Sequence, residues 1–430
     1  KNGLKVWGGH RFTKGTTLAL LERILSGRIH HGTLTITQQY GDAHVFGSAA
    51  AGWPDVTLRI VHRNAERRIL LNPRLGLAEA YMDGSVTVDG DDIMGLVEII
   101  RRNNPWEKGG EIGDQKPLKA LFDQILRPFQ QLNSLARSRA NVAHHYDLSN
   151  DFYRLWLDED MQYSCAYWAE ADDTLERAQL AKKAHIAAKL ALQPGQKVLD
   201  IGCGWGGMAL YLNKVAGVEV LGITLSAEQL KLARARAEAA GVADKVRFEL
   251  LDYRVLAKRA PGTFDRIVSV GMFEHVGVPQ FTTYFRACAN LLKDDGVMLL
   301  HTIGRLGTPG TTDAFTRKYI FPGGYIPALS ETLAASEKVK LIASDIETLR
   351  LHYAMTLREW YARVQIHREA IVAQYDERFY RMWIFYLAGA TAAFESGGMG
   401  NYQIQFTRDR RALPITRDYI IEAEKALMRR

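Results

Sequence analysis

A buried strand that runs into a glycine-rich turn constrains the fold of this chain more than any other feature. The turn lies in the run Lys197-Val-Leu-Asp-Ile-Gly-Cys-Gly-Trp-Gly-Gly207, and a helical pattern follows it. Glycines allow the backbone to approach a ligand closely, and the first turn of a helix offers free N–H groups. The run therefore predicts a nucleotide-like ligand at one edge of a sheet.

The residues that follow this turn predict strands and helices in alternation. One helix is expected over Ala227–Ala240, between the second and third strands. Alternation on this spacing is typical of an α/β fold with a parallel, doubly wound sheet. The five expected strands are Lys197–Ile201, Val218–Thr224, Val246–Leu251, Phe264–Val270 and Val297–Thr302.

The N-terminal residues predict a smaller α+β domain without a catalytic constellation, which suggests binding or scaffolding. Helices are expected over Thr17–Leu25 and Asp91–Arg102, and an antiparallel sheet from four β-rich stretches: Gly32–Gln38, His44–Ala49, Val56–Val61 and Tyr81–Val88. A polar stretch rich in proline and glycine follows and predicts a linker. We therefore expect an N-terminal domain over 1–103, a linker over 104–119 and a second domain over 120–430.

Composition narrows the partners of the chain. A length of 430 residues favours two domains, and a formal net charge of +7 favours an anionic partner: nucleic acid, an anionic membrane surface or an acidic substrate. The three cysteines are far apart, which disfavours a zinc ribbon or a disulfide framework and fits a reducing cytoplasm. His144 and His145 lack a third ligand at helical spacing, so no metal site is expected. No apolar run is long enough to span a membrane, so any membrane association is expected to be peripheral.

The glycine spacing alone leaves two cofactors open. Gly202, Gly204 and Gly207 satisfy the pattern of dinucleotide sites, which bind NAD. An NAD site, however, places an acidic residue about 20 residues further on for the ribose, where this chain has Gly222-Ile-Thr-Leu-Ser226. The ribose partner would have to be neutral, such as Thr224 or Gln229.

The run from Asp200 through the glycines, with Asp252 at the end of the third strand, resembles the S-adenosylmethionine site of Rossmann-like class I methyltransferases. In those enzymes a residue at the position of Asp252 contacts the adenine amino group. The resemblance assigns the cofactor to Tyr146, Tyr163, Ser164, Asp200, Gly202, Gly204, Gly206, Thr224, Gln229, Asp252 and Tyr253.

Further segments, in the same order along the chain, resemble the cyclopropane fatty acid synthases and their mycolic-acid relatives. They are His144–Trp156, Met161–Trp168, Gly271–Gly277, Leu299–Gly304, Lys318–Gly324, His352-Tyr353 and Tyr402–Phe406. The resemblance implies methyl transfer from S-adenosylmethionine to cis double bonds of phospholipid acyl chains. It also implies an N-terminal lipid-binding domain, a homodimer, and a cytoplasmic enzyme held at the inner face of the membrane.

Ring closure requires a base, because the alkene that attacks the methyl group becomes a carbocation that must then lose a proton from that methyl group. The family is understood to use bicarbonate as this base. The resemblance places the bicarbonate cage at Cys165, Glu274, His301, Ile303 and Tyr353, with backbone contacts from Cys165 and Ile303. Aromatic faces could stabilise the cation; the candidates are Tyr163, Trp168, Phe273, Tyr319 and Tyr325.

One departure from the family excludes a covalent mechanism through a cysteine late in the chain. Family members often carry a cysteine in a late Tyr-Leu-x-x-Cys segment, where this chain has Ala390, and no cysteine follows Cys288. Cys203 in the glycine turn is interpreted as a small filler of the loop. Basic clusters offer contacts to phospholipid headgroups; they are Arg127, Arg137 and Arg139, and Arg408, Arg410 and Arg411.

Three alternatives remain open from the sequence. Relatives on the same scaffold form a methyl or methylene branch without closing a ring. A second alternative is an inactive, lipid-binding protein. The third, a nucleic-acid methyltransferase, is disfavoured because Gly271–His275 replaces the (D/N)PP(Y/F) segment of amino-methylating enzymes and no nucleic-acid-binding motif is present.

Overall fold

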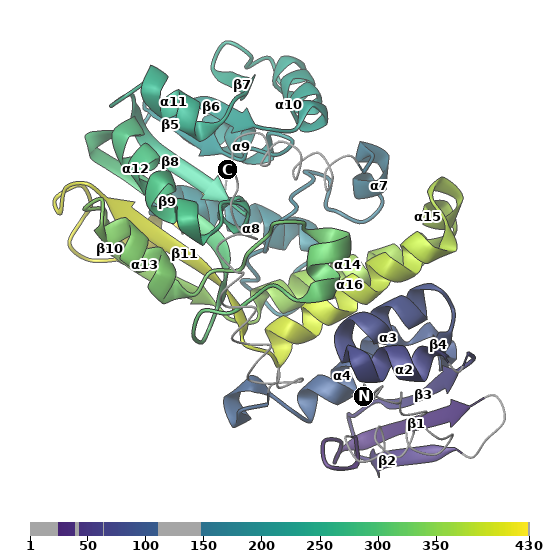
Figure 1. Cartoon of the computed structure of the whole chain (residues 1–430). Coiled ribbons are helices and arrows are strands. Elements are labelled where there is room, and N and C mark those ends of the chain that lie inside the picture. Colours follow the sequence, from purple (N-terminus) through teal and green to yellow (C-terminus); the bar gives the residue numbers. More distant parts are fainter. Residues whose placement is uncertain (1–24, 39–42, 63, 111–147, 429–430) are drawn as a thin grey trace, which may run out of the picture. The chain divides into compact units, whose positions relative to one another are not determined.

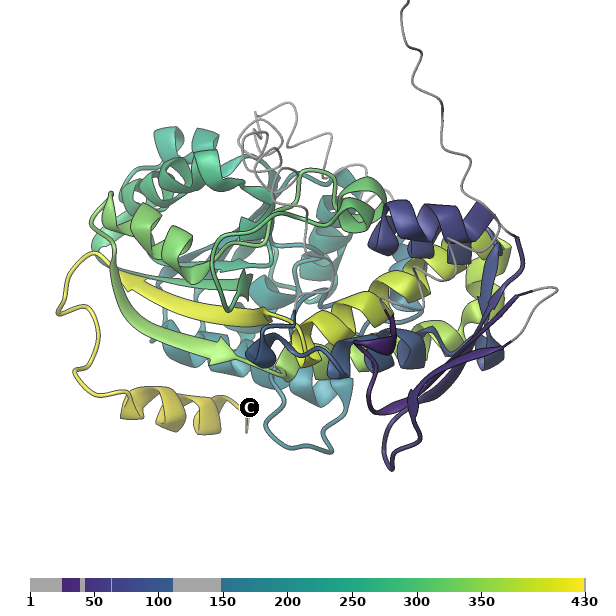
Figure 2. The same ribbon diagram turned by 60° about the horizontal axis from the view of Figure 1, so that its bottom comes forward.

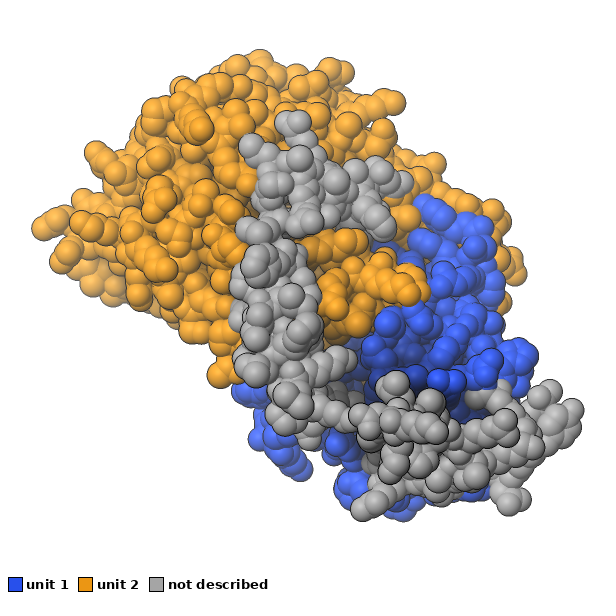
Figure 3. All heavy atoms as spheres, in the orientation of Figure 1, with its two compact units in different colours: residues 1–113, 375–389 blue, residues 114–374, 390–430 orange. Residues whose placement is uncertain are grey.

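The computed structural model describes residues 25–38, 43–62, 64–110 and 148–428. The chain divides into two compact units, which Figure 3 shows in two colours. Unit 1 comprises residues 1–113 with 375–389, and unit 2 comprises residues 114–374 with 390–430. Residues 375–389 thus group with the small unit, although no sequence pattern separates them from the second domain.

Unit 1 contains a four-stranded sheet in the order β2-β1-β3-β4. The strands are β1 (Gly32–Gln38), β2 (His44–Ser48), β3 (Asp55–Ile60) and β4 (Val86–Val88). The expected all-antiparallel sheet is wrong at one pair, because β1 and β3 run parallel. The other two pairs, β1 with β2 and β3 with β4, are antiparallel. The pattern of alternating side chains predicts strands but contains no information on their relative direction.

The helices of unit 1 follow local capping signals. Within the described residues up to 110 these are α2 (Asn64–Leu71), α3 (Pro73–Met82) and α4 (Ile93–Arg102), with short 3-10 turns at Asp89–Asp91 and Trp106–Lys108. Asn72 accepts a hydrogen bond from the Leu75 N–H just before the proline that begins α3. The expectation of a strand over Tyr81–Val88 is therefore wrong in its first half, since α3 continues to Met82 and a turn at Gly84 precedes β4.

Residues 375–389 join unit 1 through contacts that are distant in sequence. They include the first part of α16 (Glu377–Glu395). Arg381 donates to the Tyr81 carbonyl at 3.3 Å, and the rings of Phe385 and Tyr81 lie 6.1 Å apart. Part of the expected linker is also ordered here, because the Asn104 side chain donates to the carbonyls of Arg28 and Ile100 at 2.9 Å.

Unit 2 contains a seven-stranded sheet in the order β10-β11-β9-β8-β5-β6-β7 (Figure 1). The strands are β5 (Lys197–Ile201), β6 (Glu219–Thr224), β7 (Val246–Leu250), β8 (Phe264–Val270), β9 (Leu292–Arg305), β10 (Ile342–Leu349) and β11 (Met399–Thr407). The five strands from β5 to β9 are parallel, and β11 lies antiparallel between β9 and β10. The predicted α/β class is confirmed.

Helices cover both faces of this sheet. One hydrophobic cluster includes residues of α8 (Leu175–Lys189), α9 (Gly207–Ala216) and α10 (Ala227–Ala239), and the other includes α11 (Tyr253–Arg259), α12 (Phe281–Leu291) and α13 (Leu329–Glu337). In the described part of unit 2, further helices are α7 (Asn150–Arg154), α14 (His352–Ile366), α15 (Arg368–Gln374) and α17 (Asp418–Leu427). Figure 2 shows α17 as the last helix before the C-terminal mark. Among the described residues, no helix is long and apolar enough to cross a membrane.

The topology positions the site. Strand β5 is buried on both faces, since Val198 packs in one cluster and Leu199 in the other. Its neighbours are β6 on one side and β8 on the other, so the chain changes direction along the sheet at β5. Ligands of open α/β sheets bind at the carboxyl ends of the strands beside such a switch point.

Candidate active site

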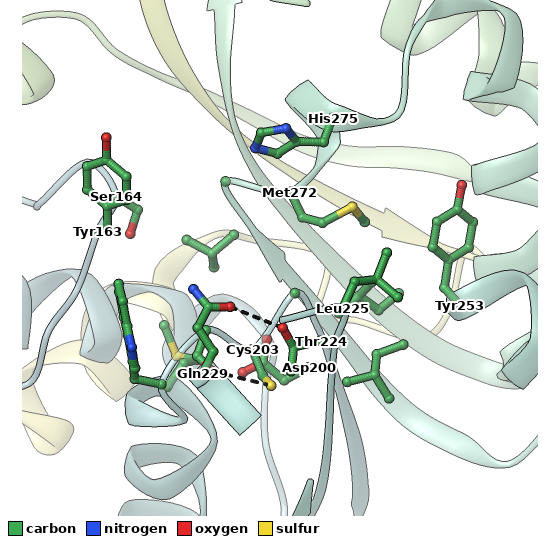
Figure 4. A pocket seen from close by; sticks show the side chains of 18 of the residues that line it. Tyr163, Ser164, Asp200, Cys203, Thr224, Leu225, Gln229, Tyr253, Met272 and His275 are labelled. Atoms are coloured by element: carbon green, nitrogen blue, oxygen red, sulfur yellow. Dashed lines mark hydrogen bonds between the residues drawn. The ribbon is translucent and has the colours of Figure 1, made fainter. Parts of the chain in front are cut away.

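A cavity opens at the carboxyl ends of β5, β6 and β8, where the topology predicts a ligand site. Figure 4 shows its lining, with Tyr163 and Ser164 across the cavity from Tyr253. Nine of the residues expected to bind the cofactor line it: Tyr163, Ser164, Asp200, Gly202, Gly204, Thr224, Gln229, Asp252 and Tyr253. Tyr146 and the pair His144–His145 lie outside the described residues.

The glycines of the turn have different roles. Gly204 has φ +53°, and no atom lies within 4 Å of where a Cβ would be, so its backbone borders open space in the cavity. Gly206 has φ +85°, and a Cβ there would lie 2.7 Å from the Phe248 ring. Gly206 is absent from the described lining and faces the packing between the turn and the sheet.

Asp200 provides a carboxylate to the cavity. Its side chain is 2% exposed, and its Oδ2 atom has no hydrogen-bond partner among the described residues. Burial raises the pKa of Asp200 to about 7, which the charge of Lys182 opposes. A buried carboxylate oxygen facing a cavity fits a cationic ligand group, such as the amino group of S-adenosylmethionine.

The end of β6 presents neutral polar groups, as expected for a ribose site. The Thr224 hydroxyl donates to the Gln229 side-chain oxygen at 3.1 Å (Figure 4) and accepts from the Ser226 N–H at 3.1 Å. Ser226 in turn caps the first turn of α10 by accepting from the Gln229 N–H. The helix cap thus fixes two groups that border the cavity.

The end of β7 presents Asp252, which caps α11. Its carboxylate accepts from the Arg254 backbone N–H at 2.8 Å and pairs with the Arg254 guanidinium at 2.7 Å. Arg254 also lines the cavity. The acid expected at the adenine is therefore held by an arginine that the sequence interpretation did not assign to the site.

Other lining residues were also missed, although each stands inside a motif that had been noticed. Trp205 belongs to the glycine turn, and its indole N–H donates to the Asn150 side chain at 2.8 Å. Gln162 precedes Tyr163, and Met272 and His275 flank Glu274. Burial lowers the pKa of His275 to about 4, so its imidazole is neutral near pH 7.

A second cluster is centred on Glu274 and β9. Glu274 accepts a hydrogen bond from the Ile303 N–H at 2.6 Å through Oε1, while its Oε2 atom has no partner among the described residues. Burial raises the pKa of Glu274 to about 7, although the bond from Ile303 opposes this. The Ile303 N–H, expected to face bicarbonate, is directed to Glu274 in this structure.

His301 lies two residues before Ile303 and is 1% exposed. Its ring nitrogens lie between two amides of β11: Asn401 Nδ2 is 3.1 Å from Nε2, and Gln403 Nε2 is 3.2 Å from Nδ1. Burial, reinforced by the charges of Lys182 and Lys189, lowers the pKa of His301 far below its usual value. The ring is therefore a neutral imidazole with its orientation fixed by β11.

Cys165 and Tyr353 belong to two segments that are joined. The Ala166 N–H donates to Thr356 at 3.1 Å, and the Trp168 N–H donates to His352 at 3.0 Å, which fastens residues 165–168 to the first turns of α14. The Cys165 thiol contacts the Ala166 carbonyl at 3.3 Å, and burial raises its pKa. The charge of Lys182 lowers the pKa of Cys165 and also that of His301.

Three of the five expected aromatic residues fall into two groups. Tyr163 lies within 5.6 Å of the rings of Tyr153, Trp156 and Trp360, a group that reaches Tyr353 through Trp360. Phe273 and Tyr325 instead belong to the hydrophobic core beside α12. Within the described ranges, no group of three histidine, cysteine or acidic residues could hold a metal ion.

Known proteins resemble this chain over most of its length. A family model described as mycolic acid cyclopropane synthetase matches residues 133–404. The cyclopropane-fatty-acyl-phospholipid synthase of Escherichia coli (strain K12) is 39% identical over 366 residues, which covers 84% of this chain and 90% of that protein. A "Probable fatty acid methyltransferase" of Pseudomonas putida is 38% identical over 334 residues, covering 76% and 81%.

Among solved structures, the mycolic acid cyclopropane synthase CmaA1 complexed with SAH and CTAB is similar, with a TM-score of 0.58 and 34% identity. The likeness covers 62% of this chain and 97% of that one. SAH is what remains of S-adenosylmethionine after methyl transfer. The order of the strands and this likeness confirm the expected Rossmann-like class I methyltransferase fold.

Proposed function

Because the chain belongs to the mycolic acid cyclopropane synthetase family and is an S-adenosylmethionine-dependent methyltransferase, we propose that it forms cyclopropane rings on the acyl chains of membrane phospholipids. The observation that carries the proposal is the pairing of a methyl-donor cavity with Glu274, in the short turn after β8, and His301, on the neighbouring strand β9. Identity to the synthase of Escherichia coli supports this substrate class.

The cavity suits S-adenosylmethionine in three places. Asp200 would accept the amino group, Thr224 and Gln229 would hold the ribose, and Gly204 would allow the backbone to approach closely. When bound, the cofactor supplies an electrophilic methyl group on a cationic sulfur. His275 also lines the cavity, and its neutral imidazole adds no positive charge to a site that would hold this cation.

Glu274 and His301 would serve the second half of the reaction. After the double bond takes the methyl group, a proton of that group must leave before the ring can close. We place a bicarbonate ion, as the base, among Cys165, Glu274, His301, Ile303 and Tyr353. Glu274 has one carboxylate oxygen without a partner among the described residues, and its pKa of about 7 allows it to take the proton that bicarbonate gives up.

Membrane association and assembly form part of the proposal. We propose that residues 1–103 bind lipid, followed by a linker over 104–119 and the methyltransferase domain over 120–430. Arg408, Arg410 and Arg411 are exposed and could contact anionic headgroups, whereas Arg127, Arg137 and Arg139 lie outside the described residues. We further propose a homodimer at the inner face of the cytoplasmic membrane.

A branch-forming methyltransferase is the second candidate, because the relative from Pseudomonas putida carries the name of a fatty acid methyltransferase. It would share the methyl-donor cavity and differ in the fate of the cation. An inactive, lipid-binding protein is disfavoured by the intact groups of both clusters, and no observation favours a nucleic-acid substrate.

The test combines purified chain, S-adenosylmethionine and liposomes of cis-unsaturated phospholipid, with liposomes of saturated phospholipid as the control. Proton NMR and mass spectrometry then identify the acyl products. We expect upfield cyclopropane protons and loss of olefinic signals in the unsaturated sample alone. A branched product would support the second candidate, and bound cofactor without any product would support the lipid-binding protein.

A further inference from the structure

A buried lysine lies against the methyl-donor cavity, and the proposed reaction assigns it no role. Lys182 is on α8 and its side chain is 0% exposed. Its ammonium donates to the Gln162 side-chain oxygen and to the Ser164 hydroxyl, both at 2.8 Å. Gln162 and Ser164 both line the cavity. Burying a charge costs free energy unless it is well hydrogen-bonded, so an apolar side chain would fill this space at a lower cost.

Neighbouring side chains of α8 hold the same segment. One turn before Lys182, the Gln179 amide donates to the carbonyls of Gln162 and Ser164 at 3.2 and 3.0 Å. Lys183 pairs with Asp160, which also pairs with Arg236 of α10. Alternate residues from 160 to 164 are therefore fastened to the helices.

The fastened segment lies directly on the glycine turn. A Cβ on Gly207 would approach the Gln162 amide nitrogen to 2.4 Å and the Asp160 carboxylate to 2.5 Å. Gly207 is the first residue of α9 and lines the cavity, and the first turn of a helix offers free N–H groups to a ligand. The position of the segment therefore determines how closely the cavity can surround a ligand.

Lys182 also acts on the carboxylate in the cavity. Among the charged groups that influence Asp200, Lys182 is the one that favours its ionised form. From these contacts we propose that Lys182 is a positioning residue of the methyl-donor site, which holds Gln162 and Ser164 against S-adenosylmethionine. The charge of Lys182 also favours the carboxylate form of Asp200, the group that would receive the ligand's amino group. The role rests on S-adenosylmethionine being the ligand of this cavity.

The groups around the two charges determine how the site responds to pH. Burial lowers the pKa of Lys182 to about 8, opposed by Asp158, Asp160 and Cys165, while Lys183 lowers it further. Cys203 faces Asp200 from the glycine turn, and burial raises the pKa of that thiol. Near pH 7 Lys182 carries its charge, and that charge favours the carboxylate form of Asp200 over the protonated form.

The test is the affinity of the purified full chain for SAH and S-adenosylmethionine, measured by calorimetry in Lys182→Met and Lys182→Gln. We expect Lys182→Met to weaken binding by roughly tenfold to a hundredfold, because a charge-assisted bond to each of two lining groups is lost. Lys182→Gln retains a hydrogen-bond donor without the charge, so we expect it to recover part of that loss. It also keeps the test valid should Lys182→Met fail to fold.

A matched control is Lys189→Met on the same helix. Lys189 is 1% exposed and pairs with Glu347, away from the cavity lining, so its loss removes a buried charge without touching Gln162 or Ser164. We expect this variant to bind SAH like the wild type. Equal weakening in both lysine variants would mean general damage to α8 and would overturn the role of Lys182.

The dependence of affinity on pH separates positioning from simple packing. Wild-type affinity for S-adenosylmethionine should rise as pH increases through about 7, where Asp200 ionises. Both Lys182 variants should move this midpoint to higher pH, and Asp200→Asn should remove it. Wild-type affinity and an unchanged midpoint in Lys182→Gln and Lys182→Met would overturn the inference. Failure of the wild type itself to bind would instead overturn the cofactor site.

Discussion

The methyl-donor cavity and the cluster around His301 are built on one sheet in opposite ways. The cavity is formed largely by consecutive residues at the ends of β5, β6, β7 and β8, and Asp200 offers it a carboxylate oxygen with no partner among the described residues. The cluster around His301 instead joins the turn after β8 to β9 and β11. Glu274 accepts from the Ile303 N–H through one carboxylate oxygen, and His301 lies between two amides of β11.

The methyl-donor cavity and the cluster around His301 should therefore respond differently to substitutions. A cavity with free ligand-facing atoms should lose affinity when its wall or its bound charges change. A cluster of mutually bonded groups should lose rate while the affinity for the cofactor is kept, because its geometry is fixed by residues that never meet the cofactor.

The largest effect is expected from Glu274→Gln. The amide keeps a carbonyl oxygen for the Ile303 N–H but cannot take a proton, so product formation should fall by about 10²- to 10⁴-fold. Calorimetry with SAH should give wild-type affinity. Turnover near the wild-type rate in this variant would remove Glu274 from the mechanism.

The next effect is expected from Gln403→Leu. Loss of the amide beside Nδ1 should let the His301 ring rotate, and we expect kcat to fall by about tenfold to a hundredfold with little change in the KM for S-adenosylmethionine. Gln405→Leu is the matched control on the same strand, since Gln405 bonds to the Lys189 carbonyl and to Tyr419. An equal loss of kcat in both variants would attribute the effect to strand damage.

A smaller effect should separate two glycines of one turn. Gly204→Ala and Gly206→Ala both place alanine at a left-handed φ, but only the second meets the Phe248 ring. We expect Gly204→Ala to weaken SAH binding by about tenfold because its methyl enters the cavity. Gly206→Ala should destabilise the fold by about 1–3 kcal/mol. Thermal unfolding and calorimetry together would show whether the two effects separate in this way.

The smallest effect concerns a histidine outside both halves. Burial disfavours the charged form of His185, but hydrogen bonds to Glu347 and Glu424 outweigh it and raise the pKa of His185. The resulting stabilisation is fully present below the unfolded-state pKa and is lost as pH rises through the folded-state pKa.

Melting temperatures of the wild type and His185→Gln should therefore differ by a few degrees in mildly acidic buffer and converge as the pH rises. A difference that stays constant with pH would show that the charge of His185 contributes nothing to stability.

Local signals in the sequence predicted one half better than the other. The bounds of β5 and β8 agree with prediction residue by residue, because an apolar run followed by glycines fixes both the strand and its end. Asp200, Thr224 and Asp252 could be assigned to one site for a similar reason, because the ends of neighbouring parallel strands meet at one edge of the sheet.

Contacts between distant segments could not be predicted in this way. The amides that hold His301 depend on the insertion of β11 between β9 and β10 with Gln403 opposite His301, a register that no local pattern records. Lys182 does not stand out in the sequence, because nothing near it shows that its ammonium bonds to Gln162 and Ser164.

In the proposed reaction, a base removes a proton from the transferred methyl group and a cyclopropane ring closes. The most direct measurement uses S-adenosylmethionine with a trideuterated methyl group, cis-unsaturated phospholipid liposomes and the wild-type chain, followed by mass spectrometry and NMR of the acyl product. Ring closure requires the loss of one deuteron from the transferred group, so we predict a cyclopropane whose bridging carbon carries two deuterons. A saturated methyl branch that keeps all three, or a deuterated methylene branch, would contradict the account.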